Sequence, residues 1–373
     1  MIAAIVIVIV LAAVATAGAL RERGDAGGEF EVVDADVEPS GSATPWPAPR
    51  PGTWRRLPPA PLSSRVDFTM LWTDDRAFVW GGFDALGRPR FDGATFDPRR
   101  GVWRPLPPVA ARDASATAVL AGSDVVLVSA SDTHRYHVAQ RRWRPGPVVP
   151  LPPGHGLDDR VMAYGDTVVV VTEPWDRSAR AAVFSLGADA DAWMRLPDVP
   201  VALSRVHVIL RTGSQLLVIG PASDGGDTAL ALDLADTPGT WYAVRAPSLP
   251  DALVSLAGAS TDRRIVLWGT RRGTGAGAVA FAAIRDRGGW RRIATAPLRP
   301  ARTVSVLWAG DQVVVWNRAD GVGASLDPAL DRWTSIPPAP AVGHEVARRA
   351  VWTGDGLLTW GALGTGGALY ALP

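Results

Sequence analysis

The sequence has 373 residues, 38 basic side chains against 37 acidic ones, and no cysteine. The balanced charge and the absence of an Arg-rich run argue against a nucleic-acid-binding surface. The lack of cysteine excludes disulfide bonds, thiolate metal ligands and a cysteine nucleophile. It does not exclude export, because a chain of this length can bury a large core without disulfides.

Residues 2–20 are an uncharged, mostly apolar run with IVIVIVLAAV at its centre. About 20 apolar residues span a bilayer as a helix, and Ala15–Ala17 resembles a signal-peptide cleavage site. Arg21 and Arg23 follow the run, which by the positive-inside rule favours a cytoplasmic C-terminal side. We nevertheless expect residues 1–20 to be a signal peptide or membrane anchor, with the rest of the chain secreted or held outside the cytoplasm.

Residues 21–53 are expected to be a linker. Residues 25–39 carry six acidic side chains and no basic one, and five prolines lie between residues 39 and 51. Repulsion between acidic groups and the stiffness of proline favour an extended spacer over a packed element.

A repeat begins at Trp54 and continues to the end of the chain. Seven segments consist of a tryptophan on a short strand that runs into a loop, usually Pro-rich, and they lie 40 to 50 residues apart. Proline cannot donate to a β-ladder, so these strands end there or lie at a sheet edge. The segments begin at Trp54, Trp103, Trp143, Trp193, Trp241, Trp290 and Trp333.

Two further series interleave with the tryptophan strands. Seven hairpins combine apolar residues, a Gly/Asp/Ser turn and a β-branched run apolar on both faces, which is typical of a buried strand. They occupy residues 72–82, 121–130, 163–173, 212–220, 260–269, 308–317 and 352–361. Between each hairpin and the next tryptophan lies another strand with a polar turn. Each unit thus holds four strands, the size of a propeller blade.

The last unit, GGALYALP, has no tryptophan strand after it, while the first tryptophan strand has no hairpin before it. If the units form a ring, residues 54–57 pair beside residues 368–372 and cover edges that would otherwise be exposed. The sequence therefore predicts an all-β fold over residues 54–373. We expect a monomeric seven-bladed β-propeller of four-stranded antiparallel blades, closed by its N-terminal strand.

At this point the chain resembles the kelch family of β-propellers. The resemblance rests on the Gly81-Gly82 doublet, the closing tryptophans, and the aromatic or aliphatic residue seven to nine positions before six of them. Those residues are Phe96, Tyr136, Phe184, Leu232, Phe281 and Leu326. Only the first hairpin keeps the full Gly-Gly doublet.

Of the 16 tryptophans, all but Trp46 and Trp175 recur at fixed positions of the repeat, which indicates that they pack between blades. The alternative function for the tryptophans is a surface on which sugar rings stack. Six hairpin turns contain Asp, and we interpret these as turn residues in preference to calcium ligands or acid/base groups. Those residues are Asp75, Asp124, Asp166, Asp262, Asp311 and Asp355. His134 and His137 flank Tyr136 on a strand and should point to opposite faces, so we expect no shared metal and no cofactor.

The remaining candidates are arginines that follow the Pro-rich loops, near the start of the first strand in five of the seven units. Leu253 and Glu345 stand near the equivalent places in the fifth and seventh units. In kelch propellers the first strand lines a central channel, and in those that bind acidic peptides Arg residues near this place face the ligand. Carried over by position, the predicted ligand-binding residues are Arg65, Arg112, Arg160, Arg205 and Arg302. The alternative is that each arginine bonds loop carbonyls or a neighbouring carboxylate.

The sequence contains no cysteine for the Cys–Tyr cofactor of kelch-like copper oxidases, no sialidase Asp box and no G-x-S-x-G elbow. We therefore expect an extracytoplasmic binding or scaffold module that presents one propeller face to a protein, an acidic peptide or an anionic glycan. The alternative is a carbohydrate-active enzyme of isomerase or lyase type with its site at the channel mouth. Catalytic activity is left open.

Overall fold

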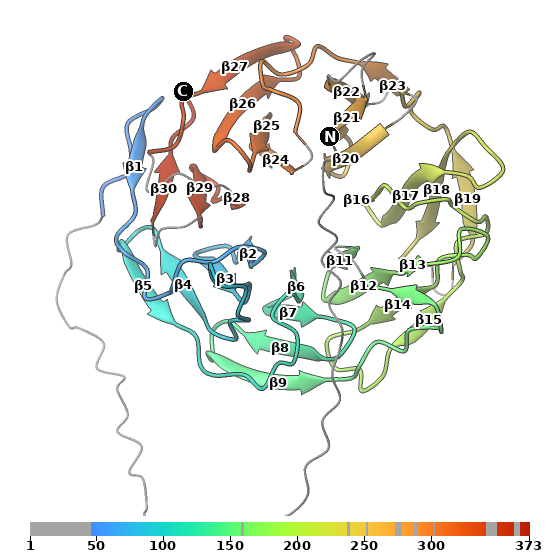
Figure 1. Cartoon of the computed structure of the whole chain (residues 1–373), viewed down its shortest axis with the longest axis horizontal. Helices are drawn as coiled ribbons and strands as arrows, with labels where there is room; N and C mark the ends of the chain where they lie inside the picture. Colours follow the sequence, from blue (N-terminus) through green and yellow to red (C-terminus); the bar gives the residue numbers. More distant parts are fainter. Residues whose placement is uncertain are drawn as a thin grey trace, which may run out of the picture. The chain divides into compact units, whose positions relative to one another are not determined.

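The alternation of apolar runs with polar Gly/Asp turns folds each predicted unit into a four-stranded antiparallel sheet, and seven such blades surround a central channel (Figure 1). This architecture comes from a computed structural model of the chain. The structure describes residues 46–373 except 158–159, 237–238, 251–252, 273–277, 287–288, 302, 341–348 and 362–365. The predicted fold class is confirmed, including the number of blades.

Each blade runs outward from its first strand, beside the channel, to its fourth strand on the rim. Blade 1 contains β2 (Thr69–Trp72), β3 (Ala77–Trp80), β4 (Gly93–Asp97) and β5 (Val102–Pro105). Blade 2 contains β6 (Thr117–Ala121), β7 (Asp124–Val128), β8 (Thr133–His137) and β9 (Arg142–Gly146). Blade 3 contains β11 (Val161–Tyr164), β12 (Thr167–Val171), β14 (Val183–Leu186) and β15 (Met194–Leu196).

The other four blades repeat this order. Blade 4 contains β16 (Val208–Thr212), β17 (Gln215–Pro221), β18 (Asp227–Asp233) and β19 (Trp241–Val244). Blade 5 contains β20 (Leu253–Ser260), β21 (Ile265–Arg272), β22 (Ala278–Asp286) and β23 (Gly289–Arg292). Blade 6 contains β24 (Val304–Ala309), β25 (Gln312–Asn317), β26 (Val322–Asp327) and β27 (Arg332–Ile336). Blade 7 contains β28 (Arg349–Trp352), β29 (Leu357–Trp360) and β30 (Gly367–Tyr370).

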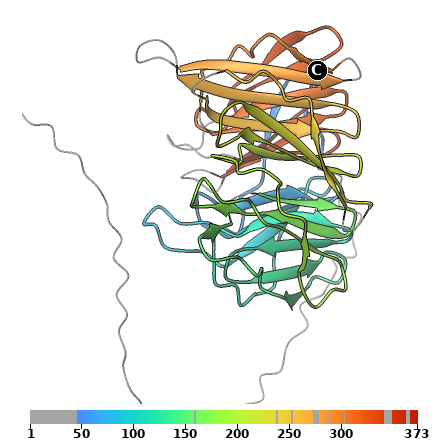
Figure 2. The same cartoon turned by 90° about the vertical axis from the view of Figure 1, so that its right-hand side faces the viewer.

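The fourth strand of blade 7 is β1 (Trp54–Arg56), from the other end of the repeat region. It pairs antiparallel with β30, with Trp54 opposite Tyr370, and Figure 1 shows the blue and red segments side by side. The predicted closure of the ring by the N-terminal strand is therefore present. Seen from the side, the strands run across the thickness of the ring (Figure 2).

The closing tryptophans connect neighbouring blades by hydrogen bonds of 2.7–3.0 Å. Each indole Nε1 donates to the carbonyl of the residue four positions after the closing tryptophan of the preceding blade. The pairs are Trp103 with Pro58, Trp143 with Pro107, Trp193 with Pro147, Trp241 with Pro197, Trp290 with Arg245, Trp333 with Ala294, and Trp54 with Pro337. Since proline cannot continue the ladder, the chain leaves the sheet there and its carbonyl faces the next blade.

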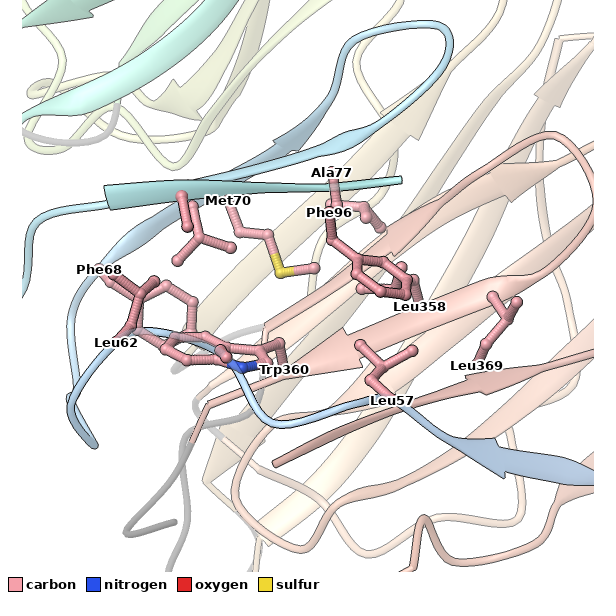
Figure 3. Packing of buried hydrophobic residues seen from close by; sticks show 13 residues of the cluster. Leu57, Leu62, Phe68, Met70, Ala77, Phe96, Leu358, Trp360 and Leu369 are labelled. Carbon is pink, nitrogen blue, oxygen red and sulfur yellow. The ribbon is translucent and has the colours of Figure 1, made fainter. Parts of the chain in front are cut away.

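Apolar side chains fill the space between blades. Between blades 7 and 1 the buried cluster combines Leu358, Trp360 and Leu369 with Met70 and Phe96, and Figure 3 shows these side chains converging. Phe68 and Trp360 are fully buried and their rings meet edge to face, 5.1 Å apart. The predicted packing role of the register tryptophans is thus confirmed at this interface.

Residues 46–53, assigned to the linker from sequence, lie against the propeller. Trp46 donates its backbone N–H to the Arg99 carbonyl and packs edge to face on Phe96. The Gly52 N–H donates to the Ala371 carbonyl. The predicted anchor, residues 1–20, and the acidic part of the linker lie outside the described residues; within the described ranges, no helix is long and apolar enough to cross a membrane.

Candidate binding site in the central channel

The central channel contains a cavity of about 970 Å³. Six blades contribute their first strands to its wall, namely β2, β6, β16, β20, β24 and β28. Blade 3 contributes Leu157 and Arg160, which lie just before β11. The cavity thus gathers residues from every blade of the ring.

One ring of lining residues occupies equivalent positions at the start of the first strands. The strand pairing within each blade defines these positions. In blade 1 Trp72 pairs with Ala77, at the start of the buried part of the second strand, and the equivalent position lies three residues before Trp72. In blade 7 it lies three residues before Trp352, which pairs with Leu357. The equivalent residues are Thr69, Thr117, Arg160, Val208, Ala257, Ser305 and Arg349. All but Thr69 line the cavity, so Arg160 and Arg349 are matching members of one layer.

Arg160 is held between blades 3 and 4. Its Nε and Nη2 donate to the Val206 carbonyl at 3.2 and 2.7 Å, and its Nη2 lies 3.3 Å from a Glu173 oxygen. Glu173 belongs to a short ribbon, β10 (His155–Gly156) with β13 (Glu173–Pro174), which the sequence did not predict. The ribbon therefore fixes Arg160 beside the cavity.

Arg65 lies elsewhere and is fully buried. It donates from Nη1 and Nη2 to the two Asp92 carboxylate oxygens at 2.9 and 3.1 Å, and from Nε to the Ser63 carbonyl. Nη1 also bonds the Gly81 carbonyl. Each nitrogen of the guanidinium has an acceptor in the neighbouring loops, and Arg65 is absent from the cavity lining.

Two more of the predicted arginines, Arg112 and Arg205, do not reach the cavity wall. Both are exposed. The Arg112 backbone N–H donates to an Asp132 carboxylate oxygen. Arg302 lies outside the described residues. Of the five arginines predicted from sequence, the structure places one, Arg160, in the wall of the channel.

Two lining arginines were missed from sequence. Arg349 begins β28, and aligning the seventh unit on Trp352 would have shown that it matches Arg160. Arg318 lies in the loop after β25, and its backbone N–H donates to the Thr303 carbonyl. The Nε of its side chain is buried and has no acceptor among the described residues. The preceding Asn317 shapes this loop by accepting from Ala319 N–H and donating to Asp320. No repeat position marks Arg318 in the sequence.

Among the lining residues that the structure describes, Arg160, Arg318 and Arg349 carry positive charge and Asp113 carries a carboxylate, while Glu173, outside the lining, is paired with Arg160. His207 also lines the cavity. Burial, followed by the nearby charges of Arg205 and Arg160, lowers the pKa of His207 to about 4. Its imidazole is consequently neutral at pH 7, and a positively charged site remains that suits an anion.

Three of the hairpin aspartates, Asp75, Asp124 and Asp262, bond arginine side chains, while the hydroxyls of Thr73, Thr261 and Thr353 make the hydrogen bonds within three of the turns. Asp75 and Arg76 form a bidentate ion pair, whose hydrogen bonds lower the pKa of the Asp75 carboxyl. His134 lies 3.3 Å from Asp132, while the His137 ring accepts from the Gln140 N–H. Within the described ranges, no three His, Asp or Glu side chains come close enough to hold a metal ion.

Comparison with known proteins adds the fold alone. No model of a protein family matches the chain, and no curated protein matches it. Among solved structures, one described as "Structure of YjhT" is similar with a TM-score of 0.51 at 12% identity, covering 75% of this chain and 99% of that one. This likeness supports the seven-bladed propeller and does not establish the kelch superfamily.

Proposed function

We propose that the protein is a binding module that takes an anionic group into the mouth of its central channel. The observation that carries this proposal is the described lining, which contains Arg318 and Arg349 from blades 6 and 7, Asp113, and Arg160 from blade 3, whose charge is paired with Glu173. Guanidinium stays charged across the physiological range and binds carboxylate, sulfate or phosphate through parallel N–H donors. The anionic group belongs to a small molecule, an acidic peptide or an acidic glycan.

The binding set in this proposal differs from the set predicted from sequence. Arg65 is left out because its guanidinium is buried and bonded to Asp92. Arg318 and Arg349 enter because they line the cavity together with Arg160. Arg112 and Arg205 become controls, because they carry the same charge outside the lining.

The test is calorimetric titration of the full-length chain with citrate and with inorganic phosphate, at low and at high salt. Arg349→Gln and Arg318→Gln should each weaken binding about tenfold at low salt, since hydrogen bonds to charged groups contribute about 1.5–3 kcal/mol. Arg112→Gln and Arg205→Gln should leave binding within about twofold. Equal losses in all four variants would reduce the effect to net charge and overturn the channel site.

A second candidate, the carbohydrate-active enzyme, is favoured by His207. Its neutral imidazole lines the cavity and can accept a proton, although a pKa of about 4 makes it a weak base at neutral pH. Incubation with uronic and sialic acids, followed by NMR, tests this function. Turnover that disappears in His207→Gln while the fold is kept would support an enzyme, and its absence with all substrates would favour the binding module.

We also propose that the propeller is of the kelch type, because it has the Gly-Gly doublet and the closing tryptophans. We further propose that it works outside the cytoplasm, because the apolar run of residues 2–20 is suited to a signal peptide or membrane anchor. A reporter enzyme that is active only in the cytoplasm, fused after Pro373, tests the location. An active reporter would contradict export.

A further inference from the structure

Trp175 differs from the other tryptophans in its exposure and in its position. It is 76% exposed, whereas every other tryptophan is buried or partly buried. Trp46 also lies outside the repeat, but it packs edge to face on Phe96. Trp175 therefore has no packing role that accounts for it, and an exposed indole of this kind is a candidate for ligand contact.

Hydrogen bonds on both sides hold the backbone at Trp175. Its N–H donates to the Gly154 carbonyl at 2.8 Å, next to the paired residues of the β10–β13 ribbon. In the turn that follows, the Asp176 carboxylate accepts from the N–H and the hydroxyl of Ser178 at 2.9 and 2.8 Å. A ring carried by such a backbone is positioned before a ligand arrives, which lowers the entropy cost of binding.

The ribbon places this indole at the rim of the channel. Gly156 pairs with Glu173 in the ribbon and directly precedes Leu157, which lines the cavity. A Cβ on Gly156 would lie only 3.3 Å from Nε1 of Trp175, so the indole lies against this glycine. Glu173, two residues before Trp175, contacts the lining residue Arg160. The indole thus stands beside the wall of the cavity without belonging to its lining.

Trp175 and the lining arginines lie at the same end of the channel. Trp175 follows β12, the second strand of blade 3, as Arg318 follows β25, the second strand of blade 6. Second strands run antiparallel to first strands, so the ends of second strands lie beside the starts of first strands, where Arg349 begins β28. A ligand at this mouth can therefore meet both the arginines and the indole.

The lining at this mouth is polar as well as charged. Ser115, Thr117 and Ser305 lie at or near the starts of first strands, and each is exposed or partly exposed. The Ser115 hydroxyl donates to Asp113 at 2.6 Å and keeps oxygen lone pairs for a further donor. The buried Nε of Arg318 has no acceptor among the described residues. These groups match a ligand that carries several hydroxyls together with an anionic group.

We propose that Trp175 is a stacking subsite for a sugar ring and that the channel ligand is an acidic oligosaccharide. Its charged group enters the lining at Arg318 and Arg349, and another of its rings lies on the indole at the rim. One face of a sugar ring presents C–H groups, so it can cover an aromatic ring while the hydroxyls at its edge stay hydrogen-bonded. More than one ring is needed, because Trp175 lies outside the cavity lining. This inference rests on the proposed function, since it names the ligand class of the same site.

The first experiment is calorimetric titration of the full-length chain with galacturonic, mannuronic and glucuronic acids and with the linear tetramer of each. At least one tetramer should bind about tenfold or more tightly than its own monomer, because a further ring reaches the indole. The methyl ester of that tetramer, which has the same rings without charge, should bind at least about tenfold more weakly. Three tetramers that bind no more tightly than their monomers would overturn the proposal.

Variants separate the indole from the arginines. Trp175→Ala should weaken the tetramer about tenfold and leave citrate unchanged, and Trp175→Tyr should restore part of the loss. Gly156→Val should act like Trp175→Ala, because its side chain displaces the indole. Arg349→Gln should weaken citrate and the tetramer alike. Leu330→Ala is the matched control, since Leu330 is 63% exposed and lies in the loop between β26 and β27, at the other end of the channel.

A second measurement follows the indole itself. The tetramer should protect part of the tryptophan fluorescence from quenching by acrylamide, citrate should not, and the protection should be absent in Trp175→Phe. If Trp175→Ala binds the tetramer as tightly as wild type, the stacking subsite is wrong and the anion site stands. If wild type binds neither citrate nor phosphate, the proposed function and this inference both fail.

Discussion

At the scale of single residues, Arg65 and Arg349, which lie at or shortly before the start of a first strand in their blades, have different surroundings. Arg65 is fully buried and bonded to Asp92, whose side chain is 56% exposed. Arg349 lies in the channel lining, with its guanidinium carbon 6.0 Å from the centre of the Phe68 ring. The first stabilises loops, and the second faces the site.

Arg65→Met should destabilise the fold by about 2–3 kcal/mol, because it leaves the Asp92 carboxylate and the Gly81 carbonyl without their donor. Urea denaturation measures the loss, with the exposed Arg205→Met as the control of equal charge. If Arg65→Met kept its stability but no longer bound citrate, Arg65 would be a ligand-binding residue and not a structural one.

His207 gives the fold a dependence on pH. Its pKa is about 4 in the folded chain, against about 6.5 for an unperturbed histidine. Between these values the unfolded chain binds more protons, so the free energy of unfolding decreases as pH falls from about 6.5 to about 4. His207→Gln should remove about 1–2 kcal/mol of that decrease, allowing for partial exposure.

Chemical denaturation of wild type and His207→Gln at several pH values between 4 and 7 measures this difference. Arg205→Gln is the companion variant, because it removes one of the charges that lower the pKa of His207 and should flatten the curve in part. Parallel curves for wild type and His207→Gln would show that another group carries the dependence.

The site could be predicted from sequence only in part, and the reason lies in loop geometry. Arg160 was found because it directly precedes a first strand. Arg65 also follows a Pro-rich loop, four residues before β2, but its partner Asp92 lies 27 residues later in a loop that no repeat pattern places. Arg349 was missed because Glu345 was aligned to the preceding loop, whereas register counted from Trp352 places Arg349 beside Arg160.

At the scale of elements, the tryptophan-to-carbonyl hydrogen bond explains why each closing strand runs into a loop after four residues. The acceptor is a proline carbonyl in five of the seven cases. Blades 4 and 5 supply the carbonyls of Arg245 and Ala294 instead. The conserved feature of the repeat is therefore the position of the carbonyl, and proline is one way to free it from the ladder.

Trp143→Phe should cost about 1–2 kcal/mol, because the Pro107 carbonyl loses its donor while most of the ring contact is kept. Thermal unfolding measures this cost. Trp175→Phe is the control, since Trp175 is 76% exposed and should tolerate the change. Equal melting temperatures for Trp143→Phe and wild type would show that the indole acts through its apolar rings alone.

Register within a blade was harder to predict than the existence of its strands. In blades 1, 2 and 6 the closing tryptophan pairs with the residue seven positions before it, whereas in blade 5 Trp290 pairs with Arg285, five positions before it. Asp286 pairs with Gly289, which leaves two residues for the turn and brings Trp290 close to the end of β22. Turn length sets this register, and the local sequence allows more than one length.

At the scale of the whole molecule, the number of blades and the closure could be predicted because both follow from counting repeats. The channel lining could not, since it depends on which loop side chains turn inward. The β10–β13 ribbon could not be predicted either, because a two-residue strand has no periodic sequence pattern.

Deleting residues 1–60 should lower the melting temperature sharply or cause aggregation. The deletion removes β1 and the Trp54–Pro337 hydrogen bond, and it exposes β30 as an edge. Deleting only residues 1–45 is the control and should leave the propeller intact. Scanning calorimetry and light scattering compare the two, and equal melting temperatures would show that closure contributes little.

The pairing of β1 with β30 also means that the folded ring has no natural first blade. The Gly52 N–H and the Ala371 carbonyl are 2.9 Å apart across the seam, so a short peptide can connect the two ends. A circular permutant joined there and reopened between β15 and β16 keeps every strand pair, and calorimetry should find a melting temperature close to that of wild type. The position of the chain ends in the ring can then be chosen by permuting the gene, and a fused domain can be attached at a connection between two neighbouring blades.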